Sequence, residues 1–188
     1  TVDGQPRVQA VLRGVRAGSG LSELAPLPET RAELEASARG FRQSTVLLSR
    51  DATEREFRGQ LLGAYGVLSF ATHGLIRDDL QGLSEPALVL TPVSAEDALD
   101  DGLLTASEIA DLSLNAWFVA LSACNTANFD LSQMAQDLPA LASAFAVAGV
   151  PATLATLWPV NSDTGQQVVS GVFEGLRASR GSALALAE

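Results

Sequence analysis

Short apolar segments alternate with helix-like segments along most of the chain. Val8, Ala10 and Leu12 alternate with polar residues and predict a first strand. Further strands are predicted where the chain is apolar throughout, at residues 45–48, 66–71, 87–91, 117–121 and 152–157. Strands of this kind are usually covered on both faces. The pattern predicts one α/β domain, with a mostly parallel, three-layer sheet that has helices on both faces.

Helix starts are marked by capping motifs in which a Thr precedes a Glu by three residues. These pairs are Thr30 and Glu33, Thr53 and Glu56, and Thr105 and Glu108. The second predicted helix runs to about Leu62. Asp137 is the predicted N-cap of a longer helix that buries Leu141 and Phe145 and ends at Gly149. A last helix is predicted to start near Ser162 or Asp163.

Composition narrows the class of protein. The 188 residues are 47% hydrophobic and 18% charged, as in an ordinary globular domain. One Cys and one His argue against a disulfide framework and against a metal site, and no cofactor is expected. Apolar runs are shorter than the ~20 residues that span a bilayer. No signal segment opens the chain, so a cytoplasmic location is expected. Because the sequence begins with Thr1, we expect a piece of a longer protein.

Charge is distributed unevenly. The net charge is −10, every basic residue is Arg, and residues 78–176 contain thirteen acidic residues and no basic ones. This balance argues against nucleic-acid binding, which depends on clusters of Lys and Arg. It predicts either an acidic face that attracts basic peptides or a set of solvated acidic loops.

The chemistry is predicted at the carboxyl ends of two buried strands, where sites form in parallel sheets. His73 follows one strand and Cys124 follows another, 51 residues later. If the two strands are neighbours, both side chains lie at the same edge. Each residue alone has a simpler interpretation, Cys as a small core residue and His as a structural one. The backbone N–H groups of Gly74 and Cys124 are candidates for an oxyanion hole.

These segments resemble the two signature segments of CHAT domains, a family of caspase-like cysteine peptidase domains usually found behind tetratricopeptide repeats. The first is residues 69–74 (SFATHG) and the second is residues 121–126 (LSACNT). The interval between His and Cys is similar to that of caspases. Four other segments are similar to the family in the same order: residues 27–33, 46–53, 101–108 and 155–160.

The resemblance implies a cysteine endopeptidase in which Cys124 is the nucleophile and His73 moves the proton. It implies that residues 1–188 form one caspase-like domain, that the parent chain has an upstream tetratricopeptide-type sensor domain that gates activity, and that the family's last helix is missing here. A peptide or protein is the expected substrate. Two alternatives remain, a non-catalytic interaction or signalling module and a redox-sensing thiol, although the latter usually needs a second Cys.

Substrate contacts are predicted at Ser122, Asn161 and Asp163. Ser122 lies two residues before the nucleophile, where relatives that cut after Arg or Lys commonly have Asp. Asp163 is either a pocket acid or the N-cap of the last helix. The chain departs from the family at residues 133–137, where a Gly-rich stretch is usual, and at Asn161. Arg77 is the nearest basic residue. We therefore expect cleavage after basic or uncharged residues and not after Asp.

Overall fold

The parallel part of the fold is a three-stranded sheet with the strand order β1-β5-β6. The computed structural model describes residues 20–21, 24–39, 41, 43–93, 99–122, 131–155, 167–168 and 171–175. The sheet consists of β1 (Val67–Ala71), β5 (Phe118–Ser122) and β6 (Thr153–Ala155). Both pairings are parallel, and the β1–β5 register runs from Val67 opposite Phe118 to Ala71 opposite Ser122. The predicted strands at 66–71, 117–121 and 152–157 are therefore confirmed.

A second, antiparallel sheet was not predicted. It has the order β2-β3-β4 and consists of β2 (Gly74–Leu75), β3 (Ala87–Val89) and β4 (Leu103–Thr105). The strand predicted at 87–91 therefore exists, but it belongs to this sheet and is antiparallel. Leu75, Leu83, Ala87 and Leu103 form its own small core. Because only Thr72 and His73 separate β1 from β2, the chain passes from one sheet to the other at the histidine.

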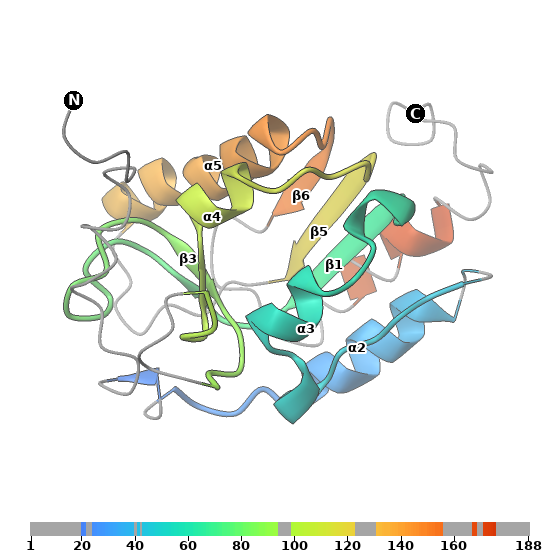
Figure 1. Ribbon diagram of the computed structural model, residues 1–188, viewed down its shortest axis with the longest axis horizontal. Coiled ribbons are helices and arrows are strands. Elements are labelled where there is room, and N and C mark those ends of the chain that lie inside the picture. Colours follow the sequence, from blue (N-terminus) through green and yellow to red (C-terminus); the bar gives the residue numbers. More distant parts are fainter. Residues whose placement is uncertain are drawn as a thin grey trace, which may run out of the picture.

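Apolar side chains cover both faces of the parallel sheet. On one face Phe70, Val119 and Leu121 pack against residues of three helices: α3 (Glu54–Arg58), α4 (Ala106–Ala110) and α5 (Leu131–Val147). On the other face Phe118 and Ala120 pack against Phe173. Helix α2 (Glu29–Ala38) contacts β1 and lies on the opposite side of it from α5 (Figure 1). The α/β fold class is confirmed.

Two of the three predicted capping motifs form. Thr105 and Glu108 make the complete reciprocal capping box of α4. Thr53 caps α3 through the Glu56 N–H, but this helix ends at Arg58 and a separate 3₁₀ turn follows at Leu62–Ala64. The box predicted at Thr30 and Glu33 is wrong. Helix α2 begins at Glu29, so Thr30 lies inside the helix and does not cap it. The Glu33 carboxylate accepts a hydrogen bond from Ser122 of the sheet instead.

Helix α5 begins six residues before the predicted cap. Asp137 is therefore inside the helix and not its N-cap. The C-terminal end is as predicted, because Gly149 has a φ of 106°, a conformation that glycine adopts without strain. Leu141 and Phe145 are buried, as expected. Residues 167–168 and 171–175 are helical, whereas the predicted start of the last helix lies outside the described residues.

The strand predicted at 45–48 is wrong. Residues 44–48 form no strand and are exposed or half-buried. Within the described residues, β1 is consequently an edge strand. A cleft of about 1560 Å³ lies between β1, α2 and residues 43–49. The first predicted strand, from Val8 to Leu12, lies outside the described residues.

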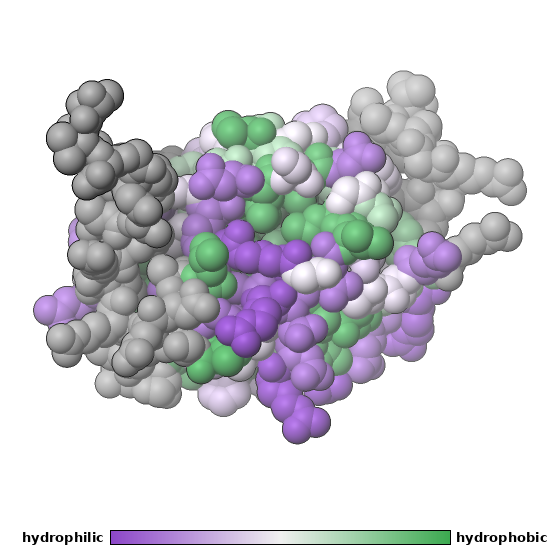
Figure 2. Space-filling view, viewed as in Figure 1, coloured by the Kyte–Doolittle hydropathy of each residue, from purple (hydrophilic) through white to green (hydrophobic). Residues whose placement is uncertain are grey.

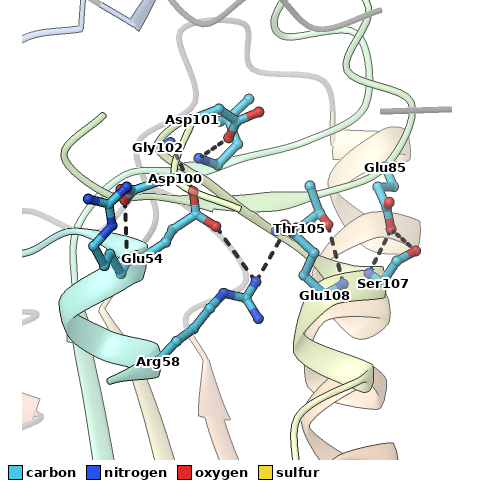
Figure 3. Close-up of polar contacts among 11 residues, drawn as sticks. Glu54, Arg58, Glu85, Asp100, Asp101, Gly102, Thr105, Ser107 and Glu108 are labelled. Carbon is cyan, nitrogen blue, oxygen red and sulfur yellow. Dashed lines mark hydrogen bonds and ion pairs between the residues drawn. The ribbon is translucent and has the colours of Figure 1, made fainter. Parts of the chain in front are cut away.

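Several acidic residues are buried in an ion-pair network and are not solvated in loops. Glu54 of α3 accepts a hydrogen bond from the Gly102 N–H and lies 3.7 Å from Arg58, which lies 3.3 Å from Glu108 of α4 (Figure 3). Asp100 pairs with Arg55 at 2.9 Å. Within the described part of the chain, no three His, Cys, Asp or Glu residues form a group suited to a metal ion. The carboxylates of this network therefore join α3, α4 and the start of β4.

Insertion into a membrane depends on the length and hydropathy of the helices. Within the described ranges, none has the length and apolar character that a membrane-crossing helix needs.

Candidate active site

The carboxyl ends of β1 and β5 lie side by side. Ala71, the last residue of β1, is opposite Ser122, the last residue of β5. The pairing continues one step further, because the Thr72 N–H donates to the Ser122 carbonyl at 3.2 Å. His73 follows immediately. Cys124 comes two residues after Ser122 and lies outside the described residues. The condition for a shared site, that the two strands be neighbours, is met, and we call this place the carboxyl edge.

The imidazole of His73 is held by the backbone of a distant loop. Its Nε2 lies 2.7 Å from the carbonyl oxygen of Ala25, and the side chain is only 8% exposed. Since a carbonyl oxygen can only accept, Nε2 carries the proton of this hydrogen bond. In the neutral ring, Nδ1 then has the free lone pair. Nδ1 is buried and has no hydrogen-bond partner within the described part of the chain. Its lone pair is therefore available to a group at the carboxyl edge.

Neighbouring strands fix the backbone around His73. The Val89 N–H donates to the His73 carbonyl at 2.9 Å, and the Thr72 hydroxyl donates to the Val89 carbonyl. These contacts come from β3, whereas the Thr72 N–H is bound to β5. His73 therefore lies at the junction of the two sheets. Its backbone carbonyl is bound to β3, and the preceding Thr72 is bound to both β3 and β5.

The backbone of Gly74 is positioned by the antiparallel ladder. Gly74 is opposite Leu88, and the adjacent hydrogen bond runs from Val89 to His73. In an antiparallel pair this arrangement makes Gly74 a non-hydrogen-bonded position, so its N–H points away from β3. The N–H is thus not used by the ladder and can serve another acceptor.

Ser122 contacts a buried carboxylate. The Ser122 hydroxyl donates to Glu33 Oε2 at 3.2 Å, across 89 residues of sequence. Glu33 is 4% exposed. Burial raises the pKa of Glu33, the Ser122 hydrogen bond opposes that shift, and the charge of Glu29 adds to it. A carboxyl group therefore lies at the end of β5, two residues before Cys124.

Arg77 links the loop after His73 to α5. Its backbone N–H donates to Asp137 Oδ2 at 2.9 Å and its guanidinium to Oδ1 at 2.8 Å. Asp137 is 2% exposed. This hydrogen bond and ion pair raise the pKa of Arg77. Arg77, considered above as a basic residue near the site, is thus already paired with a carboxylate of the chain.

The remaining predicted contacts, Asn161 and Asp163, lie outside the described residues. Sequence reasoning missed three features: the Ala25 carbonyl, Glu33 and Asp137. A backbone carbonyl has no sequence signal. Glu33 and Asp137 were both assigned to helix caps, a local role that fits their residue types. One feature of the sequence could have indicated that Glu33 is buried. The exposed side of its helix already carries charged residues, and Glu33 falls on the opposite, inner side.

The chain matches a known protein family. Neither a curated protein nor a solved structure shows a match to the chain. A family model described as the CHAT domain matches residues 4–188. This match spans nearly the whole sequence and agrees with the resemblance of the segments around His73 and Cys124. The chain belongs to the CHAT domain family.

Proposed function

We propose that this chain, a caspase-like family member, is a cysteine endopeptidase that uses the pair His73 and Cys124. The observation that carries the proposal is the hydrogen bond between His73 Nε2 and the Ala25 carbonyl. It leaves Nδ1 as the base, and a base without a partner is what a thiol nucleophile requires. The adjacency of β1 and β5 supports it further, because both residues follow the paired ends of these strands by two positions.

The proposed reaction has two steps. The Cys124 thiol transfers its proton to His73 Nδ1, and the sulfur attacks the carbonyl carbon of the scissile peptide bond. The oxyanion receives hydrogen bonds from the N–H groups of Gly74 and Cys124. The His73 imidazolium then gives its proton to the leaving amine, the C–N bond breaks, and a thioester remains. Water, deprotonated by His73, hydrolyses the thioester and restores the thiol.

Activation by His73 is needed because a free thiol has a pKa of about 8.5 and is mostly protonated at neutral pH. The Ala25 carbonyl accepts from Nε2–H and so fixes the tautomer and the orientation of the ring. In this role the loop before α2 is the third member of the site. It orients the ring so that Nδ1 is the atom that exchanges the proton with the thiol.

The proposal extends to the surroundings of the site. Residues 1–188 form one domain with the three-layer caspase-like arrangement, and a peptide segment is the substrate. Asn161 and Asp163 are proposed to contact the substrate beside the carboxyl edge. A tetratricopeptide-type sensor domain in the parent chain is proposed to gate the activity, in the cytoplasm.

A peptide electrophile tests the proposal. A peptidyl acyloxymethyl ketone should alkylate the purified protein once, and intact-mass measurement assigns the adduct because the chain has a single Cys. We expect labelling far faster than that of free cysteine, no label in Cys124→Ala, and slow labelling in His73→Ala with unchanged melting. Labelling of the unmodified protein at the rate of free cysteine would contradict the proposal and favour a non-catalytic interaction module.

A further inference from the structure

Helix α2 buries polar side chains where a surface helix normally buries apolar ones. Its buried residues are Glu33 and Ser37. The outer side, which carries Arg31 and Glu35, is hydrophilic as well (Figure 2). A helix that packs on a sheet is usually stabilised by an apolar stripe. Burial of a carboxyl group without a partner of opposite charge, in contrast, costs folding free energy.

In the part of the chain that the structure describes, no cation lies beside Glu33. Within the described residues it makes no ion pair, and its Oε1 is buried without a hydrogen-bond partner. The hydroxyl oxygens of Ser37 and Ser69 are also buried and have no partner among the residues described. Three polar atoms thus lack partners in one region, where native proteins usually leave very few.

These atoms lie on the same face of the sheet. Val67 of β1 and Phe118 of β5 belong to the core on that face. Since side chains alternate along a strand, Ser69 and Ala71 share it on β1, and Ser122, bound to Glu33, shares it on β5.

The same face opens into the cleft beside β1. Thr30 and Ser37, which precede and follow Glu33 on the inner side of α2, line the cleft together with Ser69 and His73. His73 and the hydroxyl groups of Ser37 and Ser69 therefore line the same cleft. Glu33 does not line it, but comes between Thr30 and Ser37 on α2.

We infer that Glu33 recognises a basic side chain, preferentially arginine, at the substrate residue before the scissile bond. The inference rests on the proposed peptidase function and names its substrate class. Ser122 lies two residues before the nucleophile, and Glu33 supplies the negative charge that Ser122 lacks. The carboxylate thus belongs to a residue of α2 that is hydrogen-bonded to Ser122, and not to a residue of β5 itself.

The chemistry of a guanidinium fits this place. Arginine presents five N–H donors in a rigid plane, and the available acceptors are Glu33 Oε1 and the two serine hydroxyls. Lysine has the charge but lacks the planar fork, so it should bind less well. Asp or Glu before the cut is disfavoured, since it would place a second carboxylate against Glu33.

Two peptides that differ only in charge provide the test. One has arginine before the scissile bond, and the other has citrulline, which has nearly the same shape without the charge. Binding of both is measured in the Cys124→Ala background, with and without Glu33→Gln, and turnover is measured with Cys124 present. Glu35→Gln is the matched control, because Glu35 is exposed on the same helix and pairs with Arg31.

We expect a preference for arginine that falls at least about tenfold in Glu33→Gln and stays unchanged in Glu35→Gln, with citrulline binding preserved in both. The inference is overturned if Glu33→Gln keeps the arginine preference of the unmodified protein. It is also overturned if a folded Glu33→Gln variant loses binding of both peptides to the same extent. If the peptides bind with the expected preference but are never cleaved, the peptidase proposal fails and the recognition by Glu33 stands.

Discussion

The Nε2 atom of His73 and the carbonyl oxygen of Ala25 lie 2.7 Å apart, although 48 residues separate them in sequence. Pro26 follows Ala25 directly, and a residue before proline is restricted to extended conformations. The direction of the carbonyl is thus partly set by the proline ring. The loop before α2 acts as a rigid support for the imidazole.

Replacement of Pro26 by Gly should release this support. We expect kcat to fall about tenfold with a nearly unchanged KM, because a freer carbonyl holds the imidazole in its productive orientation for less of the time. Steady-state kinetics measures both constants. Pro151→Gly is the control, since Pro151 is exposed in the turn after α5 and should leave kcat unaltered. Equal effects of the two variants would argue against a role of the loop.

Asp137→Asn should weaken the link between the loop after His73 and α5. The variant loses the ion pair with the Arg77 guanidinium. It keeps at most one oxygen acceptor for the backbone N–H of Arg77. We expect a loss of about 1–3 kcal/mol in the free energy of unfolding, measured by urea denaturation. Asp78→Asn is the control, because Asp78 is exposed and its φ of 68° is one that Asn adopts readily. A loss of the same size in the control would show that the contacts of Asp137 with Arg77 are not its cause.

Glu54 should make the stability pH-dependent. Burial, followed by the charge of Glu108, raises the pKa of Glu54 to about 7. The unfolded value is near 4.5, so between these values the folded state binds more protons, and stability falls as the pH rises. In Glu54→Gln the Gly102 contact can persist without titration. Its stability relative to the unmodified protein should therefore increase by up to ~3 kcal/mol from pH 4.5 to pH 8.

Thermal melts across this pH range provide the measurement for Glu54. Glu56→Gln is the matched control, because Glu56 is exposed on the same helix. It should melt in parallel with the unmodified protein at every pH. A Glu54→Gln variant that does the same would contradict the raised pKa.

Gly102→Ala should destabilise the junction of β3 and β4. Gly102 has a φ of 90°, and an added Cβ would lie 2.9 Å from the Pro92 Cβ and 3.0 Å from the Leu90 carbonyl oxygen. We expect a loss of about 1–3 kcal/mol in unfolding free energy. Gly63→Ala meets no atom within 4 Å and should change stability by less than about 1 kcal/mol. Similar values for the two variants would exclude strain at Gly102.

Local patterns in the sequence were enough to predict the elements that hold the site. The continuous apolar stretches at 66–71 and 117–121 predicted β1 and β5, because strands buried on both faces carry no polar alternation. The capping box of Thr105 was predicted because its two hydrogen bonds join residues only three apart. The positions of His73 and Cys124 after these strands followed from the same reasoning.

Tertiary structure decided the contacts around the site. Glu33 bonds to Ser122 across 89 residues and Asp137 to Arg77 across 60, where their residue types had predicted helix caps. The same carboxylate can either cap a helix or make a long-range contact, and tertiary packing decides which of the two it makes. The pairing of β3 with β2 and β4 could not be predicted, since strands of two or three residues are too short to show a period. The sequence by itself determined the α/β class and placed His73 and Cys124 after buried strands. Only the folded arrangement decided which carboxyl group contacts Ser122 and which carbonyl oxygen contacts His73, because these contacts join elements that are far apart along the chain.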